Sequence, residues 1–255
     1  MPDPTNWIRV IRSSHDRFSA LVTPLSGEQV RGPSYADEWS IAQVASHLGS
    51  QAEIFALFLD AGLNGSTAPG REAFGPIWDR WNALDPVEQV SQSIAANERL
   101  VGRLEQTTPD QQQRFSLPMF GSDVDLAGMA AMRLAEHALH TWDVAVMFDP
   151  DATVPFDAVE LLVDTVEQTA ARAGKPVQGV GPVAITTNAP DRAFLLTAEP
   201  IVSLAARNDS GADPLRLPAE ALVRLVAGRL DPAHTGPAVG EDSRLTQLRS
   251  VFPGF

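Results

Sequence analysis

The period of the hydrophobic pattern changes once along this chain, near Gly174-Lys175-Pro176. Before this segment the apolar residues recur at the spacing of amphipathic helices, and after residue 180 they alternate as in short strands. The charge changes at the same place, because residues 1–172 hold 24 acidic and 11 basic residues and residues 173–255 hold eight of each. We therefore predict a helical bundle over residues 1–174 and a small α+β domain over residues 180–255.

The first domain is predicted to contain four long helices and one accessory helix. Ser40 and Gln43 form a capping box that marks the start of the second helix, and Asp157 precedes the fifth helix as its N-cap. Four long helices of this kind favour a mainly α fold built as an up-down four-helix bundle. The five predicted helices cover residues 6–22, 40–61, 85–106, 125–147 and 157–172.

The segment between the second and third helices is rich in glycine and proline over residues 62–76. We expect a surface loop followed by a short helix around Ile77 to Trp81. Because long loops inside compact domains often carry function, the segment is also a candidate lid. Its neighbourhood holds Arg71 and Arg80, and the sequence leaves open whether either contacts a ligand.

The second domain is predicted to combine short strands with two helices. Three strands should form a meander, Leu215 to Leu217 adds a fourth, and Asp242 caps the last helix. The expected strands cover residues 183–187, 193–198, 201–206 and 215–217, and the expected helices cover residues 218–227 and 243–251.

The composition excludes several classes of protein and site. The chain has no cysteine, so it can form neither a disulfide nor a thiolate metal site. Its net charge of −13 repels phosphate backbones and anionic lipids, so we expect neither nucleic acid nor a membrane as a partner. The densest apolar run, Ile54 to Leu59, is too short to span a bilayer, and the N-terminus lacks the pattern of a signal peptide. We expect a soluble cytoplasmic protein.

Four ionisable residues follow one another along one face of the helix predicted over 125–147. Arg133, Glu136, His140 and Asp143 are spaced by three, four and three residues, and apolar residues continue the same stripe at both ends. Such a stripe should face the bundle core, where unpaired charges are costly. Glu136 and His140 can therefore converge on one metal ion, although their spacing also fits an intrahelical ion pair.

His47 is a third candidate ligand, since it lies on the apolar side of the second helix. Alone, it fits a core histidine with satisfied hydrogen bonds better than a metal ligand. Together, the three side chains favour a metal site with an open position, as in catalytic zinc centres, and nickel or iron would accept similar ligands. Arg133 is then expected to neutralise charge and Asp143 to orient a ligand, although a plain salt bridge would also explain both.

Two segments of the chain resemble those of a known family. Residues 39–48 read WSIAQVASHL and residues 133–144 read RLAEHALHTWDV, and both are similar to helix motifs of DinB-like metal proteins. With the Gly228-Arg229 turn and the closing residues 252–255, they resemble most the mycothiol-dependent maleylpyruvate isomerase family. The resemblance implies a DinB-like bundle with a small sterol-carrier-like C-terminal domain. It also implies zinc on His47, Glu136 and His140, and an active-site role for Arg229.

The resemblance and the residue chemistry agree on one mechanism. One zinc ion per chain would hold a low-molecular-weight thiol, such as mycothiol, as its thiolate. The thiol would act on an electrophilic and acidic small molecule, either in a cis–trans isomerisation or in an S-transfer. The alternatives are a metal-dependent hydrolase and a metal-bearing protein that binds a small molecule without catalysis.

Overall fold

The computed structural model describes residues 3–36, 38–119, 121–236, 238–240 and 242–254. Its contacts divide the chain into two compact units, Met1–Ala152 and Thr153–Phe255. Phe255, the last residue of the closing segment, lies outside the described residues. The first unit is mainly helical, and the second contains a four-stranded sheet.

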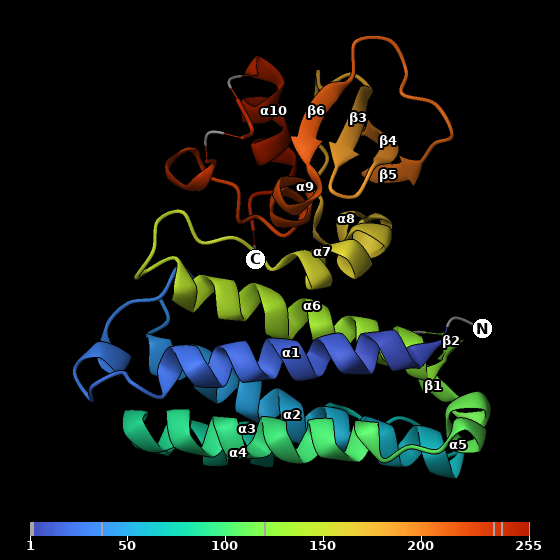
Figure 1. Ribbon diagram of the computed structural model, residues 1–255. Helices are drawn as coiled ribbons and strands as arrows, with labels where there is room; N and C mark the ends of the chain where they lie inside the picture. The colour runs from blue at the N-terminus through green and yellow to red at the C-terminus, as the bar shows by residue number, and fades with distance from the viewer. Residues whose placement is uncertain (1–2, 37, 120, 237, 241, 255) are drawn as a thin grey trace. The chain divides into compact units, whose positions relative to one another are not determined.

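Four long helices form the bundle of the first unit (Figure 1). α1 packs against α4 and α6, and α2 packs against the same two helices, so α1 and α2 lie diagonally across the bundle. This arrangement confirms the predicted four-helix bundle and adds the order of its helices. The four are α1 (Pro4–Val22), α2 (Ile41–Asn64), α4 (Pro86–Glu105) and α6 (Leu126–Ala145).

Side-chain caps set where these helices begin. Ser40 and Gln43 form the predicted capping box before α2, and Asp85 caps α4. Asp125 accepts a hydrogen bond from the backbone N–H of Gly128 at 2.8 Å and caps α6 in the same way. Because a cap fixes the first turn, it also fixes which later residues of the helix face the core.

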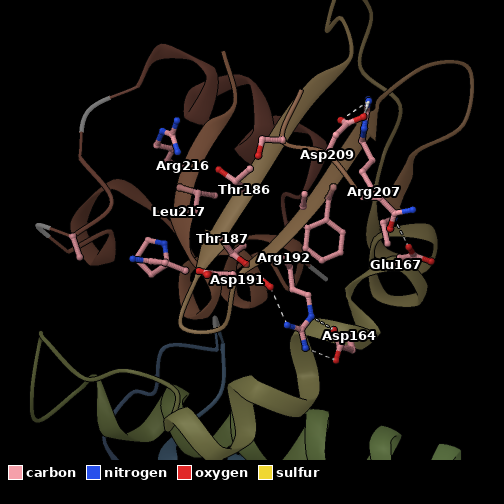
Figure 2. Close-up of a pocket in the computed structure, with 18 residues that line it drawn as sticks. Asp164, Glu167, Thr186, Thr187, Asp191, Arg192, Arg207, Asp209, Arg216 and Leu217 are labelled. Carbon is pink, nitrogen blue, oxygen red and sulfur yellow. Dashed lines mark hydrogen bonds and ion pairs between the residues drawn. The ribbon is translucent and has the colours of Figure 1, made fainter. Parts of the chain in front are cut away.

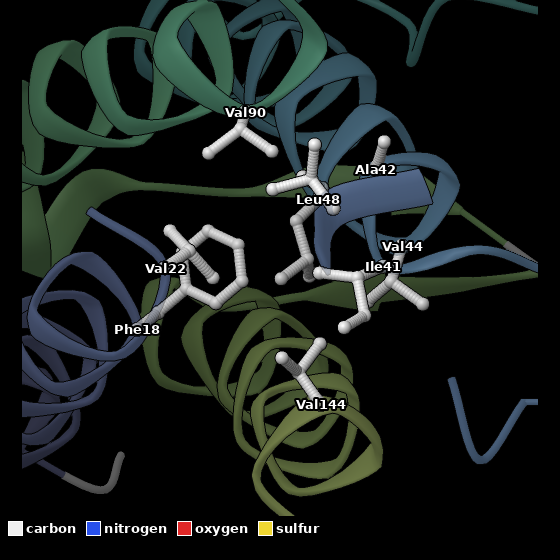
Figure 3. Close-up of a cluster of buried hydrophobic side chains, with 10 residues drawn as sticks. Phe18, Val22, Ile41, Ala42, Val44, Leu48, Val90 and Val144 are labelled. Atoms are coloured by element: carbon white, nitrogen blue, oxygen red, sulfur yellow. The ribbon is translucent and has the colours of Figure 1, made fainter. Parts of the chain in front are cut away.

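The apolar faces of the four helices meet in a common core. Figure 3 shows Phe18 of α1, Leu48 of α2, Val90 of α4 and Val144 of α6 packed in one cluster of buried side chains. Burying an apolar side chain of this size stabilises the fold by roughly 1.5–3 kcal/mol. Leu48 directly follows His47, so the packing of Leu48 also fixes the backbone that carries this candidate ligand.

The segment between α2 and α4 is mostly helical. α2 ends at Gly65, whose φ of 64° is the left-handed conformation that favours glycine at a helix end. The turn η2 (Arg71–Ala73) leads into α3 (Gly75–Asn82), which packs against α2 and buries Trp81. The predicted short helix is confirmed, and only residues 65–70 and Phe74 of the candidate lid lie outside regular structure.

Three further short elements of the first unit were not predicted from the sequence. They are the turn η1 (Gln29–Arg31), the helix α5 (Pro109–Arg114) and a hairpin of β1 (Leu117–Met119) and β2 (Ser122–Val124). Within the described residues of both units, every helix is too short or too polar to cross a bilayer.

The second unit begins earlier in the chain than the sequence predicted. α7 (Phe156–Leu162) and α8 (Val166–Ala173) pack against α9 (Ala219–Val226), and α8 also packs against β5 (Ser203–Ala206). The division therefore falls between Ala152 and Thr153 rather than at residues 174–180, because these helices bury their apolar sides on the later part of the chain.

The predicted helix over residues 157–172 also differs from the structure. It is interrupted by the turn η3 (Val163–Thr165), which separates α7 from α8. Asp157 is not its N-cap, since Pro155 occupies that position and Asp157 stands in the first turn of α7. An acidic residue is favourable both at the N-cap and in the first turn of a helix, so the presence of Asp157 alone does not show at which residue α7 begins.

The sheet of the second unit has the strand order β5-β4-β3-β6. β3 pairs antiparallel with β4 and β4 with β5, whereas β6 pairs parallel with β3 and sets Ile185 opposite Leu215. The predicted meander and fourth strand are confirmed, and so is the small α+β class of this unit. Its other elements are β3 (Val183–Asn188), β4 (Arg192–Thr197), β6 (Leu215–Pro218), η4 (Pro232–His234) and α10 (Ser243–Val251).

Candidate metal centre

His47, Glu136 and His140 come together where α2 packs against α6. Nε2 of His47 lies 3.1 Å from Oε2 of Glu136, and Nε2 of His140 lies 3.7 Å from the same oxygen. One potential ligand atom of each residue lies within 4.8 Å of the other two. The fold thus brings together the three side chains that the sequence suggested as ligands, although they come from helices far apart in the chain.

The spacing of these atoms suits a small divalent cation. Zinc binds nitrogen and oxygen at about 2.0–2.2 Å, so two ligands of a tetrahedral site lie about 3.3–3.6 Å apart. The separations of 3.1 and 3.7 Å bracket that value. Two imidazoles and one carboxylate also leave a fourth position for a further ligand. The donor set and its spacing therefore fit zinc.

The three side chains remain accessible from solvent. The exposed fraction is 13% for the side chain of His140, 25% for His47 and 42% for Glu136. A small molecule can therefore reach an ion held by these residues, which a fully enclosed structural site would not allow.

Asp143 forms a hydrogen bond with Nδ1 of His140, the ring nitrogen that does not face Glu136. Its Oδ2 lies 2.8 Å from Nδ1 of His140, and the Asp143 side chain is fully buried. A carboxylate at Nδ1 places the ring proton on that nitrogen and leaves the Nε2 lone pair free to face Glu136. An orienting role of Asp143 requires this contact with His140, and the role itself stays a prediction.

Trp39 lies against both imidazole rings. Its ring centroid is 5.0 Å from that of His47 and 5.9 Å from that of His140, with an interplanar angle of 26° to His140. The two histidine rings are themselves 4.6 Å apart. The sequence reasoning did not assign Trp39 to the site, although its place at the head of the WSIAQVASHL segment was a signal for it.

Arg133 lies beside the cluster and donates its hydrogen bonds to neutral oxygens, and the charge-neutralising role expected for it stays a prediction. Nη1 donates to Oε1 of Gln51 at 3.1 Å, and Nη2 donates to the backbone oxygen of Leu48 at 3.1 Å and to the side-chain oxygen of Asn97. Spacing along one helix could not show these acceptors, because they belong to α2 and α4.

Gln51 fills the space between Arg133 and the candidate ligands. Its Nε2 donates to Oε2 of Glu136 at 2.8 Å and lies 3.0 Å from Nε2 of His47. Sequence reasoning missed Gln51. The available signal was its position four residues after His47, which places both on one face of α2.

The electrostatics favour the forms of these side chains that bind metal. Burial lowers the pKa of His47, so its imidazole is neutral at pH 7. Burial alone would raise the pKa of Glu136, but the hydrogen bond with His47 and the neighbouring His140 outweigh it and lower the pKa to about 2. Burial lowers the pKa of Arg133 to about 10, which leaves it cationic at pH 7. Neutral imidazole and ionised carboxylate are the ligand forms.

The three other arginines considered from the sequence have different surroundings. Arg229 follows α9 in the second unit and donates to a backbone carbonyl of that unit at 2.9 Å, and its catalytic role stays a prediction. Arg80 forms an ion pair with Glu53 of α2. Arg71 lies 6.0 Å from the ring centroid of Trp78. Arg71 and Arg80 therefore have partners within the first unit.

A second pair of histidines is buried between α1 and α6. Nδ1 of His137 lies 2.9 Å from Oγ of Ser14, and Nε2 of His15 lies 3.1 Å from a carboxylate oxygen of Glu98. Burial lowers the pKa of both histidines. Among the described residues this pair does not gather three metal-ligating side chains, so we interpret it as polar packing inside the bundle.

A cavity of about 710 Å³ opens in the second unit (Figure 2). Its charged walls are largely paired, since Arg192 lies 2.6 Å from Asp164 and Arg207 lies 2.7 Å from Asp209. None of the three candidate ligands lines this cavity. Its paired charges give it a polar surface without the convergent donors of a metal centre.

One family model matches the first part of the chain. Residues 11–145 match the model described as the mycothiol maleylpyruvate isomerase N-terminal domain. The matched segment includes all three candidate ligands, His47, Glu136 and His140. Among curated proteins the sequence finds no match.

Solved structures share the fold over most of the chain. The crystal structure of the mycothiol-dependent maleylpyruvate isomerase matches with a TM-score of 0.61 and 18% identity, over 89% of this chain and 90% of that chain. A histidine-to-alanine mutant of the isomerase gives the same values. YfiT from Bacillus subtilis, which has an unusual four-helix bundle topology, matches with a TM-score of 0.41 and 17% identity, over 57% of this chain and 87% of that chain.

Proposed function

Because the chain belongs to the mycothiol maleylpyruvate isomerase N-terminal domain family, we propose that it is a metal-dependent enzyme that uses a low-molecular-weight thiol. In this proposal His47, Glu136 and His140 hold one zinc ion, and the thiol is mycothiol or a close relative. The observation that carries the proposal is the convergence of these three side chains on one point, with spacings that fit zinc.

The charge of the donor set supports a thiol as the further ligand. The two histidines are neutral donors and Glu136 contributes one negative charge, so a divalent ion would keep a net charge of about +1 at this site. When bound, zinc supplies a positive charge that lowers the pKa of a coordinated thiol and stabilises its thiolate. The chain itself has no cysteine that would compete for this position.

The residues around the ion have distinct parts in this proposal. Asp143 holds the proton of His140 on Nδ1, at 2.8 Å, and thereby keeps Nε2 available as a donor. Glu136 stays ionised because its pKa is lowered to about 2. The ring of Trp39 packs against both imidazoles and would help to hold them in place.

The reaction we propose is a cis–trans isomerisation of an acidic, electrophilic small molecule, or an S-transfer to one. A bound thiol supplies a sulfur nucleophile that adds to an activated double bond, permits rotation about the resulting single bond, and is then eliminated as the trans isomer forms. Arg229 is the residue we propose to bind the substrate carboxylate, since an acidic substrate needs a cation near a chain of net charge −13.

The same donor set also occurs in catalytic zinc sites that activate water, so a metal-dependent hydrolase is the competing function. Turnover separates the two. Conversion of a cis-enone acid that requires both zinc and the added thiol supports the proposed enzyme, whereas hydrolysis of an ester or amide without thiol supports the hydrolase. Zinc binding without turnover of either kind would indicate a non-catalytic binding protein.

The metal centre can be tested independently of any substrate. Metal analysis of the purified protein should give close to one zinc per chain, and His47→Ala, Glu136→Ala and His140→Ala should each lose most of it. His234→Ala is the matched control, because His234 forms an ion pair with Asp231 in the second unit and is not part of the cluster. Full zinc occupancy in His140→Ala would refute the ligand assignment.

A further inference from the structure

Arg133 fixes the orientation of the Gln51 side-chain amide. A guanidinium group only donates hydrogen bonds, so the amide atom that lies 3.1 Å from its Nη1 must be the oxygen, Oε1. The amide nitrogen of Gln51 therefore faces Glu136 and His47. The chemistry of the arginine thus settles an orientation that the shape of an amide leaves ambiguous.

The amide nitrogen meets two of the three candidate ligand atoms. It lies 2.8 Å from Oε2 of Glu136 and 3.0 Å from Nε2 of His47, and these two atoms are 3.1 Å apart. A carboxylate oxygen has two lone pairs, so Glu136 can keep the hydrogen bond from Gln51 while it also binds a cation. Nε2 of His47 donates its proton to Glu136 in the metal-free chain and therefore does not also accept from Gln51, and on binding a cation it would turn its lone pair to that cation. The lasting contact of Gln51 is therefore with Glu136.

The cation of Arg133 is buried, and its hydrogen bonds to the residues that the structure describes include none to a carboxylate. Its side chain is 1% exposed, and the acceptors that it uses are the neutral oxygens of Gln51, Leu48 and Asn97. A donor that is charged polarises the amide it binds, which strengthens the hydrogen bond that the amide donates on its other side. On its other side, the Gln51 amide donates a hydrogen bond to Glu136.

We propose that Gln51 is a positioning residue of the metal centre, and that the buried cation of Arg133 acts on Glu136 through it. Gln51 holds the carboxylate at the point where α2 and α6 meet, and Arg133 holds Gln51. This inference rests on the proposed metal centre, and it assigns two residues that are not themselves ligands.

The test is the zinc affinity of the metal-free protein, measured by competition with a chromogenic chelator. Gln51→Leu keeps the volume of the side chain but removes the amide, and we expect it to bind zinc about 10–100-fold more weakly. Gln106→Ala, at the exposed glutamine that follows the last residue of α4, is the control and should bind as the unaltered chain does. The thermal melt of metal-free Gln51→Leu should be lowered, because Nη1 of the buried Arg133 loses an acceptor, so zinc affinities are compared at a temperature at which both forms are folded.

The visible absorption spectrum of a cobalt-substituted site is a second measurement. The Gln51→Leu substitution would leave this spectrum unchanged if Gln51 only stabilised the fold. The visible absorption of bound Co²⁺ depends on the positions of its ligands, so Gln51→Leu should alter that spectrum and Gln106→Ala should not. Arg133→Met should weaken zinc binding when it is made alone. Made together with Gln51→Leu, it should raise the zinc dissociation constant by less than about a further twofold, because the amide through which Arg133 acts on Glu136 is already absent.

The outcomes separate this inference from the proposed function. If the unaltered chain binds zinc and Gln51→Leu binds it equally well with the same cobalt spectrum, the role of Gln51 is refuted and the metal centre stands. If Arg133→Met has its full effect in the Gln51→Leu background, Arg133 does not act through Gln51. If the unaltered chain binds neither zinc nor cobalt, both the metal centre and this inference are wrong. Gln51→Leu alone decides the role of Gln51 if Arg133→Met does not fold.

Discussion

Replacing Asp143 by asparagine should weaken zinc binding while preserving the shape of the site. Asp143 is fully buried, and its Oδ2 lies 2.8 Å from Nδ1 of His140. Asparagine keeps an acceptor oxygen of the same size but removes the negative charge. The hydrogen bond changes from a charge-assisted one, worth about 1.5–3 kcal/mol, to a neutral one, worth about 0.5–1.5 kcal/mol.

The expected loss follows from that difference. About 1.4 kcal/mol corresponds to a tenfold change in affinity, and residues that orient a metal-binding histidine typically contribute 10–100-fold. We therefore expect Asp143→Asn to raise the zinc dissociation constant by at least about tenfold. The His140 ring also becomes free to adopt its other tautomer, which adds to the loss and does not offset it.

The assay is chelator competition at pH 7.5, with a thermal melt of each metal-free form to confirm folding. Asp60→Asn is the matched control, because Asp60 forms an ion pair with Arg103 on the exposed side of α2 and loses the same charge away from the site. A zinc dissociation constant within twofold of both the unaltered chain and Asp60→Asn would refute the orienting role of Asp143.

Three further predictions concern stability and substrate binding. Burial lowers the pKa of His15 below its ordinary value of 6.5. On acidification the unfolded chain is protonated at this histidine before the folded chain is, so the free energy of unfolding should fall as the pH drops below about 6.5. In urea unfolding at pH 7.5 and 5.5, this fall should be smaller for His15→Gln than for the unaltered chain, by at most about 1.4 kcal/mol per pH unit. An equal fall in the two proteins would contradict this. Gly49→Ala would place a Cβ 2.2 Å from the ring of Trp81, so a denaturant melt should show a loss of about 1–3 kcal/mol. Gly102→Ala meets nothing within 4 Å and should be neutral or stabilising, and equal effects of the two changes would refute the packing argument. Arg229→Ala should retain zinc but lower kcat/KM about tenfold for an acidic electrophile and much less for a neutral one; unchanged kinetics would show that another residue binds the carboxylate.

Sequence analysis predicted which side chains share a helix face, because this follows from the period of a single helix. Glu136, His140 and Asp143 share a face of α6 because of the helical period, and the structure places all three in one cluster with His47. The start of α2 was also predictable, since the capping box that begins at Ser40 is a local signal. Each of these features depends on residues within a few turns of one another.

Contacts between helices were not predictable in the same way. The period of an amphipathic helix shows which side faces the core but not which helix packs there, so the diagonal relation of α1 and α2 was missed. For the same reason the sequence could not show the acceptors of Arg133, because Gln51 and Asn97 lie on α2 and α4. The change of period near residue 174 marks the start of the strands and not the boundary between the units. α7 and α8 precede it in the chain but pack against α9, which follows it.

The order of the helices has a consequence for how the site is assembled. His47 and Glu136 are separated by 89 residues, and α4 lies between them in the chain. Closing a flexible loop of that length costs on the order of 4 kcal/mol of chain entropy, and the apolar packing of the bundle contributes to offsetting this cost. Because Glu136 and His140 lie on α6, a nascent chain has the full set of candidate ligands only after α6 has left the ribosome. The N-terminal half of the bundle therefore cannot assemble this centre by itself.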